Sequence, residues 1–541
     1  MFLHGSSVGE NLRCRELATS AKSTRTLELA LDWRQEIIRG RALEARGSPH
    51  ASYCWQLMMS SIHRSIFFSA VERYGTLLLF LFSTAVLSRL LEPSEFGIYA
   101  VINAVVAVIA ASFQEFGGAN YLIQKKALSE RNIRTAFTIT FCISIIIGLT
   151  LFICSDALVW FFRQDGLKAG IAVSTLNFAL TPFSVVISAL FRRDMEFGKL
   201  AICSLAANFV SIAVSIALAV LHYSFMAPIW GSVAGNIILT VLLISFCENK
   251  QIFRPSLSEY PDVIRFGLYS GGISIINVFY NLAPQIFLAR ILDFAAVGLY
   301  SRAVSITQVF DKLVGQVLGP VIMPAIFAQT KAGGNLKRIY LDAITLLTAV
   351  HWPFLTFLAI MAQPIISIWL GPTWLEIVPL VRMMCIAYLA LFAACLTYPV
   401  LVALGSVRDA LISSLISLPP SLLIIFVASF FGVEAVAASA MLTLPFQAAV
   451  AIYFISRHLD FGVLDLMRGT FKSGIVTLFS SVGAAVCAAM VEYGLLPPIA
   501  GLGLACISAA ICWLLSMVVT EHPLLPRLQR AAAGLFGIPV S

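Results

Sequence analysis

Several ionisable side chains stand inside stretches of sequence that are otherwise strongly apolar. They are Glu72, Arg73, Glu115, Asp311 and Lys312, and Arg302 stands at the outer end of such a stretch. A charge at the centre of a bilayer costs at least about 2.5–3.5 kcal/mol on insertion scales, so each is a candidate functional residue if its stretch spans a membrane. Lys312, Arg73 and Arg302 are candidates for binding an anionic group, because Lys supplies a point charge and Arg a bidentate donor.

The acids in the same stretches predict a different chemistry. Glu72, Glu115 and Asp311 are candidates for binding a proton or a sodium ion, because partial burial raises the pKa of a carboxylate. Structural roles remain open as alternatives. Lys312 can pair with Asp311, and the acids can form salt bridges or cap helix ends. Arg73 can extend to the membrane edge, and Arg302 stands at the end of an apolar stretch, which favours an interfacial position.

The composition indicates that these stretches do lie in a membrane. Of the 541 residues, 59% are hydrophobic and 12% are charged, and the mean hydropathy is +0.90. A soluble domain carries about 25% charged residues. This balance excludes a soluble enzyme, a disordered chain, a disulfide scaffold and a nucleic-acid binder. The 11 cysteines show no metal-ligand spacing, so we expect no metal site and no bound cofactor.

The length and order of the apolar stretches predict an all-α, polytopic membrane protein. A helix needs about 20 apolar residues to cross a bilayer, and solid apolar runs argue against a β-barrel. By this measure we expect about fourteen spans. They centre near residues 66–88, 97–119, 133–155, 168–190, 200–222, 226–246, 265–289, 297–323, 338–362, 378–402, 408–431, 434–456, 471–491 and 495–519.

The placement of Lys and Arg predicts the orientation of the spans. The loops after even-numbered spans carry 17 of these residues, and the loops after odd-numbered spans carry 6. Because cytoplasmic loops are enriched in Lys and Arg, the bias puts even loops and both termini in the cytoplasm. Arg192 and Arg193 most simply enforce this topology, and they can also touch diphosphate headgroups at the cytoplasmic face.

An internal repeat divides the predicted spans into two sets. Residues 89–99, RLLEPSEFGIY, align without gaps with residues 290–300, RILDFAAVGLY, at an offset of 201. The offset covers six spans, so both copies face the same side of the membrane, and the repeat is parallel. We therefore expect two six-helix lobes followed by two appended helices. A two-lobed bundle of this kind is typical of transporters, in which one lobe rocks against the other around a central cavity.

These features define a predicted domain organisation. Residues 62–247 form the N-lobe, 248–264 a cytoplasmic linker, 265–457 the C-lobe, 458–519 helices 13 and 14, and 520–541 a cytoplasmic tail. Residues 1–61 are a polar extension without the apolar core of a secretory signal. Disorder and a start codon assigned too early are alternative interpretations of it, and Met58 or Met59 is then the expected start.

Five segments in order carry a family resemblance. Residues 89–99 and 116–125 (FGGANYLIQK) resemble the first-loop signature of bacterial polysaccharide exporters, and residues 191–197 (FRRDMEF) resemble the family's basic segment. Residues 298–303, and 370–374 with 379–382, are similar to its second-half signatures. The family is the Wzx-like lipid-linked oligosaccharide flippases, which belong to the multidrug/oligosaccharidyl-lipid/polysaccharide exporter superfamily.

The resemblance implies a function. It implies a non-enzymatic transporter that moves a polyprenyl-diphosphate-linked repeat unit from the cytoplasmic to the periplasmic leaflet of the bacterial inner membrane. The product would feed exopolysaccharide, capsule or O-antigen assembly, with a polymerase and a chain-length regulator as partners and a proton or sodium gradient as the energy source. A cation-coupled multidrug exporter of the same superfamily is the alternative. A membrane glycan polymerase or ligase is a weaker one, because the outer loops are short.

Overall fold

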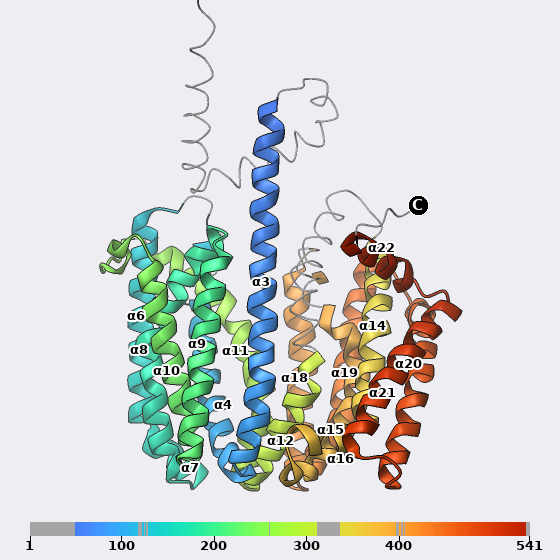
Figure 1. Ribbon diagram of the computed structural model, residues 1–541. Helices are drawn as coiled ribbons and strands as arrows, with labels where there is room; N and C mark the ends of the chain where they lie inside the picture. The colour runs from blue at the N-terminus through green and yellow to red at the C-terminus, as the bar shows by residue number, and fades with distance from the viewer. Residues whose placement is uncertain are drawn as a thin grey trace, which may run out of the picture.

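The chain folds as a bundle of long helices in the computed structural model (Figure 1). The structure describes residues 49–536 except 117–121, 124, 126–127, 259, 311–335, 397–399, 402–403 and 405. The first half of the chain contains α3 (Pro49–Leu90), α4 (Pro93–Phe116), α6 (Glu130–Ile153), α7 (Ser155–Phe162), α8 (Gly166–Arg193), α9 (Phe197–Val220), α10 (Met226–Phe246) and the short η2 (Lys250–Phe253).

The second half and the C-terminal helices follow the same pattern. The second half contains α11 (Tyr260–Ile291), α12 (Phe294–Thr307), α14 (Leu336–Ile360), α15 (Ala362–Trp369), η3 (Pro372–Ile377), α16 (Val378–Tyr388), η4 (Leu389–Leu396), α18 (Val407–Ser429) and α19 (Val433–Leu459). The C-terminal part contains α20 (Val463–Glu492), α21 (Pro498–Val519) and α22 (Leu524–Phe536). All the regular structure in the described residues is helical, which confirms the predicted fold class.

Twelve helices in the described residues are long and apolar enough to cross a membrane. They coincide with twelve of the fourteen predicted spans. The other two predicted spans, near residues 265–289 and 297–323, fall on α11 and α12, and part of the second lies outside the described residues. Large apolar side chains such as Leu78, Ile146 and Val519 are exposed on the outside of the bundle, as expected for surfaces that contact lipid.

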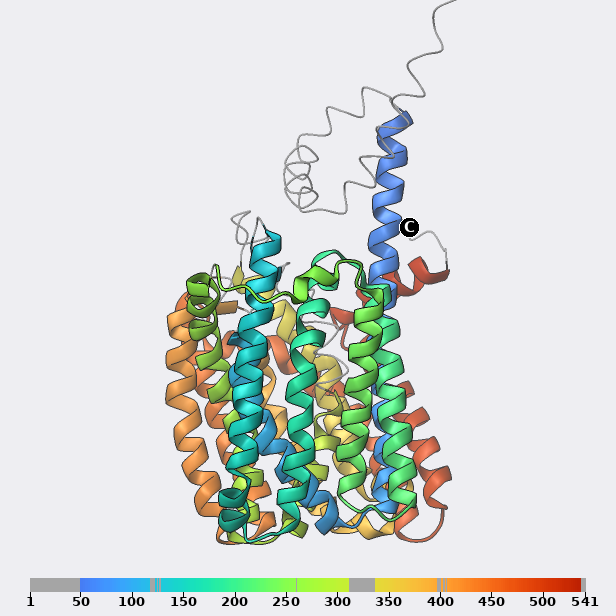
Figure 2. The same cartoon turned by 90° about the vertical axis from the view of Figure 1, so that its left-hand side faces the viewer.

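The helices gather in two groups that meet along α4. In the first group α9 packs along α3 and α10, and α8 packs along α6 and α10; in the second, α19 packs along α16 and α18. The C-terminal helices α20 and α21 pack on each other, α20 packs along α14, and α21 contacts α15. Helix α4 packs along both α11 and α12, so it joins the two groups. The helices run nearly parallel when the first group faces the viewer (Figure 2).

The two ends of the bundle differ in what they carry. Helix α22 and the first residues of α3 lie at one end, and α7 and α15 lie at the other (Figure 1). We call these the terminal end and the distal end. The terminal end also carries the turn between α8 and α9, with Arg192 and Arg193.

The repeat in the sequence is a repeat in structure. Helix α3 ends at Leu90 and α4 begins at Pro93, while α11 ends at Ile291 and α12 begins at Phe294, so both helix breaks are shifted by the same 201 residues. The acids of the repeat stabilise the two turns. The Asp293 carboxylate accepts a hydrogen bond from the backbone N–H of Ala296 (2.7 Å) and caps α12. The Glu95 carboxylate accepts one from the backbone N–H of Glu92 (3.0 Å).

Candidate functional site

The two glycines of the repeat lie against each other at the distal end. A Cβ atom built on Gly97 would overlap the backbone carbonyl oxygen of Phe294 and lie 3.1 Å from the backbone nitrogen of Gly298. The converse holds for Gly298, whose added Cβ would overlap the backbone carbonyl oxygen of Pro93. Pro93 and Phe294 are themselves equivalent in the repeat. The first turns of α4 and α12 therefore meet backbone to backbone around a local two-fold axis, and only glycine permits this approach. We call this contact the α4–α12 junction.

A buried arginine lies next to the junction. Arg302 on α12 is only 4% exposed. Its Cζ atom lies 3.7 Å from the ring centroid of Phe96 on α4 and 5.4 Å from that of Trp374 in η3. Its Nε has no hydrogen-bond partner among the described residues. The guanidinium is thus held by two aromatic faces, which stabilise a desolvated cation.

This position corrects the expectation that Arg302 is interfacial. The turn between α11 and α12 does lie at the end of the bundle, but Arg302 is two turns further along α12, on the face that packs against α4 and η3. The place of Arg302 near the end of its apolar stretch indicated how deep in the membrane it lies. Its burial within the protein depends instead on which face of α12 it occupies.

Three hydrogen bonds attach the end of α3 to the second half near the same place. The indole N–H of Trp374 donates to the carbonyl oxygen of Ser88 (2.6 Å), and that of Trp369 donates to Leu81 (3.1 Å). Arg89 donates from a guanidinium nitrogen to the carbonyl oxygen of Ile368 (2.7 Å). The distal end is therefore closed by contacts between the two halves, at both α3 and α4.

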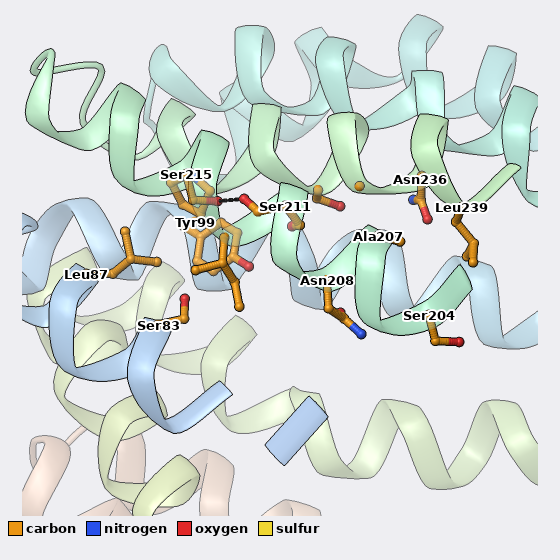
Figure 3. Close-up of a pocket in the computed structure, with 14 residues that line it drawn as sticks. Ser83, Leu87, Tyr99, Ser204, Ala207, Asn208, Ser211, Ser215, Asn236 and Leu239 are labelled. Carbon is orange, nitrogen blue, oxygen red and sulfur yellow. Dashed lines mark hydrogen bonds between the residues drawn. The ribbon is translucent and has the colours of Figure 1, made fainter. Parts of the chain in front are cut away.

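A polar cavity of about 360 Å³ lies in the first half, between α3, α4, α9 and α10. Figure 3 shows the residues that line it, among them Tyr99 and the serines of α9. Eight of its fourteen lining residues have polar side chains and none carries a charge at neutral pH. The polar ones are Ser83, Tyr99, Ser204, Asn208, Ser211, Ser215, Ser232 and Asn236.

A smaller cavity of about 120 Å³ occupies the matching place in the second half, between α11, α12, α16, η4, α18 and α19. Tyr300 lines it, and Tyr300 is the repeat equivalent of Tyr99 in the larger cavity. Its two glutamine amides are bound to two of its tyrosine hydroxyls. Gln308 donates to the Tyr388 hydroxyl (3.0 Å), and Gln447 donates to the Tyr280 hydroxyl. The two cavities are thus equivalent in position and different in volume.

The structure places two of the predicted membrane charges on one helix. Glu72 and Arg73 lie on α3 and are half-buried. The side chains of Glu115, Asp311 and Lys312 lie outside the described residues, so their predicted roles stay predictions. Among the described residues, no three His, Cys, Asp or Glu side chains gather as ligands for a metal.

The basic pair at the terminal end has two different environments. Arg192 is exposed, whereas one guanidinium nitrogen of Arg193 donates to the carbonyl oxygens of Leu122 (2.6 Å) and Lys125 (2.7 Å). Arg193 therefore anchors the connection after α4 to the end of α8.

Sequence reasoning missed two parts of this site. The serines and Asn208 of the larger cavity recur along α9 at residues 204, 208, 211 and 215, which is the spacing of one helix face. This polar face on an apolar helix could have predicted the cavity. No sequence pattern predicts the contact of Arg302 with Trp374, because 71 intervening residues separate them along the chain.

Comparison with known proteins shows where this architecture occurs. A family model described as "Polysaccharide biosynthesis protein" matches residues 86–379, slightly more than half of the chain. The chain is 23% identical to "Lipopolysaccharide biosynthesis protein WzxC" of Escherichia coli over 306 residues, covering 56% of this chain and 61% of that protein. It is 21% identical to "Succinoglycan biosynthesis transport protein ExoT" of Rhizobium meliloti over 321 residues, covering 58% of this chain and 63% of that protein. The chain thus spans less than two thirds of the length of each.

Two solved structures share the fold. The structure titled "Lipid II flippase MurJ, inward closed conformation" matches with a TM-score of 0.68 at 11% identity, covering 85% of this chain and 100% of that one. An inward-facing multidrug resistance transporter of the MATE family and MOP superfamily matches with a TM-score of 0.56 at 14% identity, covering 71% and 94%. At these identities the likeness concerns the fold.

Proposed function

Because the chain belongs to the polysaccharide biosynthesis protein family, we propose that it carries a polyprenyl-diphosphate-linked oligosaccharide across the bacterial inner membrane. The direction is from the cytoplasmic to the periplasmic leaflet, with both termini in the cytoplasm. The protein is then a transporter and not an enzyme, and its product is used in exopolysaccharide, capsule or O-antigen assembly. A polymerase and a chain-length regulator are its proposed partners.

The α4–α12 junction is the observation that carries this proposal. It joins equivalent helices of the two halves around a local two-fold axis, and it closes the distal end. Transporters built on parallel repeats work by rocking one half against the other. Separation of α4 from α12 would open the distal end, which the charge bias assigns to the periplasm.

Arg302 has a proposed role in this movement. In the closed junction its charge is desolvated, and its Nε has no hydrogen-bond partner in the described part of the chain. Separation of α4 and η3 from α12 would free the guanidinium, which can then bind a diphosphate bidentately. Arg73 and Lys312 are further proposed contacts for the diphosphate, and Glu72, Glu115 and Asp311 are proposed sites for a coupling proton or sodium ion.

A drug exporter is the second candidate, because the MATE-family structure shares this fold. Sites for drug-sized ligands are lined predominantly by apolar and aromatic side chains. The larger cavity here is lined mainly by serine, asparagine and tyrosine, which favours a sugar-bearing substrate. Expression in a pump-deficient host separates the two, since raised drug resistance would favour the exporter.

The proposed function is tested by deleting the gene in a strain with no other flippase for the same repeat unit. We expect lipid-linked repeat units to accumulate on the cytoplasmic face and surface polysaccharide to fall. Normal surface polysaccharide in that strain would overturn the proposal.

A further inference from the structure

The cavity between α3, α4, α9 and α10 has unused hydrogen-bonding groups. The hydroxyls of Ser83, Ser204, Ser211 and Ser232 line it, and none of them has a hydrogen-bond partner in the described residues. By contrast, Ser215 donates to the carbonyl oxygen of Ser211 (2.7 Å), within its own helix. Other serines of the bundle satisfy their hydroxyls in the same way, as Ser245 and Ser456 do.

A hydroxyl both donates and accepts, and a side-chain amide offers a donor at one atom and an acceptor at another. Sugar hydroxyls have the same dual character, so each can pair with a serine or an asparagine whichever way it points. A diphosphate has different needs, because it is an acceptor that binds best to cationic donors. The cavity lining has no such donor. An alkyl chain is also a poor occupant, since it would leave the hydroxyls unpaired.

The cavity volume fits a small ligand. At about 360 Å³ it lies near the lower end of the range for small-molecule sites, about 300–1,000 Å³. The equivalent cavity in the second half is a third of that volume, and its glutamines are bound to its tyrosines. Of the two related places, only the one in the first half has both room and free hydroxyls.

The position of Tyr99 connects the cavity to a cation. Tyr99 lines the cavity and lies close enough to Arg302 to interact with it electrostatically. Phe96, one turn before Tyr99 on α4, stacks on the Arg302 guanidinium. A neutral pocket therefore adjoins a buried cation, which matches a ligand whose neutral sugar is attached to an anionic group.

From these observations we infer that the α3–α4–α9–α10 cavity is a binding subsite for an uncharged sugar of the lipid-linked substrate. This inference rests on the proposed function and adds to it a site and a chemical class. The sugar's hydroxyls bind the free serine hydroxyls and the amide oxygen of Asn208, whose Nδ2 donates to the Thr76 hydroxyl (3.4 Å). Its attached diphosphate lies on the Arg302 side of Tyr99.

The test uses two lipid probes and two variants of the purified full-length protein. The probes are a polyprenyl diphosphate bearing one neutral hexose and the same polyprenyl diphosphate without sugar. The test variant is the double substitution Ser211→Ala and Ser232→Ala, which removes two free hydroxyls without adding volume. The matched control is Ser245→Ala with Ser456→Ala, whose hydroxyls bond within their own helices.

We expect the wild-type protein and the control to bind the glycosylated lipid more tightly than the bare lipid. The test variant should lose about tenfold in affinity for the glycosylated lipid, from two lost hydrogen bonds, and keep its affinity for the bare lipid. A test variant that keeps the wild-type preference would overturn the subsite and leave the proposed function standing. Equal weakening toward both lipids would also overturn it, because the loss would then be structural. If the wild-type protein binds neither lipid, the proposed function fails and the subsite fails with it.

Discussion

A single methyl group at the α4–α12 junction should disturb the closed state of the distal end. In a Gly97→Ala variant the new Cβ would overlap the carbonyl oxygen of Phe294 and lie 2.6 Å from its carbonyl carbon. Real Cβ atoms essentially never approach another heavy atom within 3.0 Å. To bring the distance between the new Cβ and the Phe294 carbonyl carbon from 2.6 to 3.0 Å, the two helices must move apart by about 0.4 Å. The overlap with the carbonyl oxygen requires a larger movement. Both neighbouring atoms belong to the backbone, so no rotamer change can relieve the overlap.

The size of the effect follows from the cost of overpacking. Extra methyl groups in well-packed interiors cost about 1–3 kcal/mol. This cost applies where α4 and α12 are in contact and disappears when they separate. A difference of this size changes the ratio of closed to open states about 5–150-fold. Gly298→Ala should act in the same way, because its Cβ would overlap the carbonyl oxygen of Pro93.

The assay is the distance between spin labels at Glu92 and Leu292, which are exposed and flank the junction. Labelling requires a background in which reactive cysteines have been replaced. We expect Gly97→Ala to add a population at longer distance and to lower transport. Gly503→Ala is the matched control, because its Cβ would meet no atom within 4 Å. A folded Gly97→Ala protein with the wild-type distance distribution would refute the interpretation of the junction.

Three further predictions concern other residues. Arg302→Met removes a desolvated charge, so the same distance measurement should show a closed junction at least as stable as in the wild type. The variant should also export less of the repeat unit. Unchanged export would argue against diphosphate binding by Arg302. Arg193→Gln should lower the free energy of unfolding by about 2–3 kcal/mol, since it removes hydrogen bonds from a charged group to two carbonyls; the exposed Arg192→Gln is the control, and equal melting temperatures would contradict the anchoring role. Burial, together with Lys472, lowers the pKa of His522, whose Nδ1 accepts from a backbone N–H and whose Nε2 lies 3.2 Å from a serine hydroxyl. Folding lowers the pKa of this base, so its stabilising contribution is complete above the unfolded pKa of 6.5 and is lost as the pH falls from 6.5 toward the folded pKa. At pH values below about 6.5, the melting temperature of the wild-type protein should therefore fall more steeply with decreasing pH than that of His522→Gln.

The fold could be predicted from the sequence because its signals are long and repeated. A run of about 20 apolar residues specifies a spanning helix on its own, and the distribution of Lys and Arg checks the order of such helices. The repeat was more informative than its length suggests. Its eleven residues contain both helix breaks, and the acids Glu95 and Asp293 stabilise the two turns through hydrogen bonds to backbone N–H groups.

The site was only partly predictable, for physical reasons. The sequence marks Gly97 and Gly298 as equivalent, but it does not say that two equivalent residues touch, because that depends on the axis relating the halves. Arg302 was a candidate by its charge, and its burial depends on Trp374, which is distant along the chain. The larger cavity has a signal in the sequence, because its serines on α9 recur at helical spacing. These serines carry no charge, so the charged residues do not indicate them.

Movement of a glycosylated lipid between the leaflets can be measured directly. The most direct test places the purified protein in liposomes whose lipid-linked repeat unit is detected from outside by a membrane-impermeant sugar-modifying enzyme. We expect the wild-type protein to make the inner-leaflet repeat unit accessible. Gly97→Ala should do so more slowly, and Gly503→Ala should not differ from the wild type. Liposomes in which the wild-type protein leaves the inner-leaflet repeat unit protected, with the proposed cation gradient present, would contradict the proposed function.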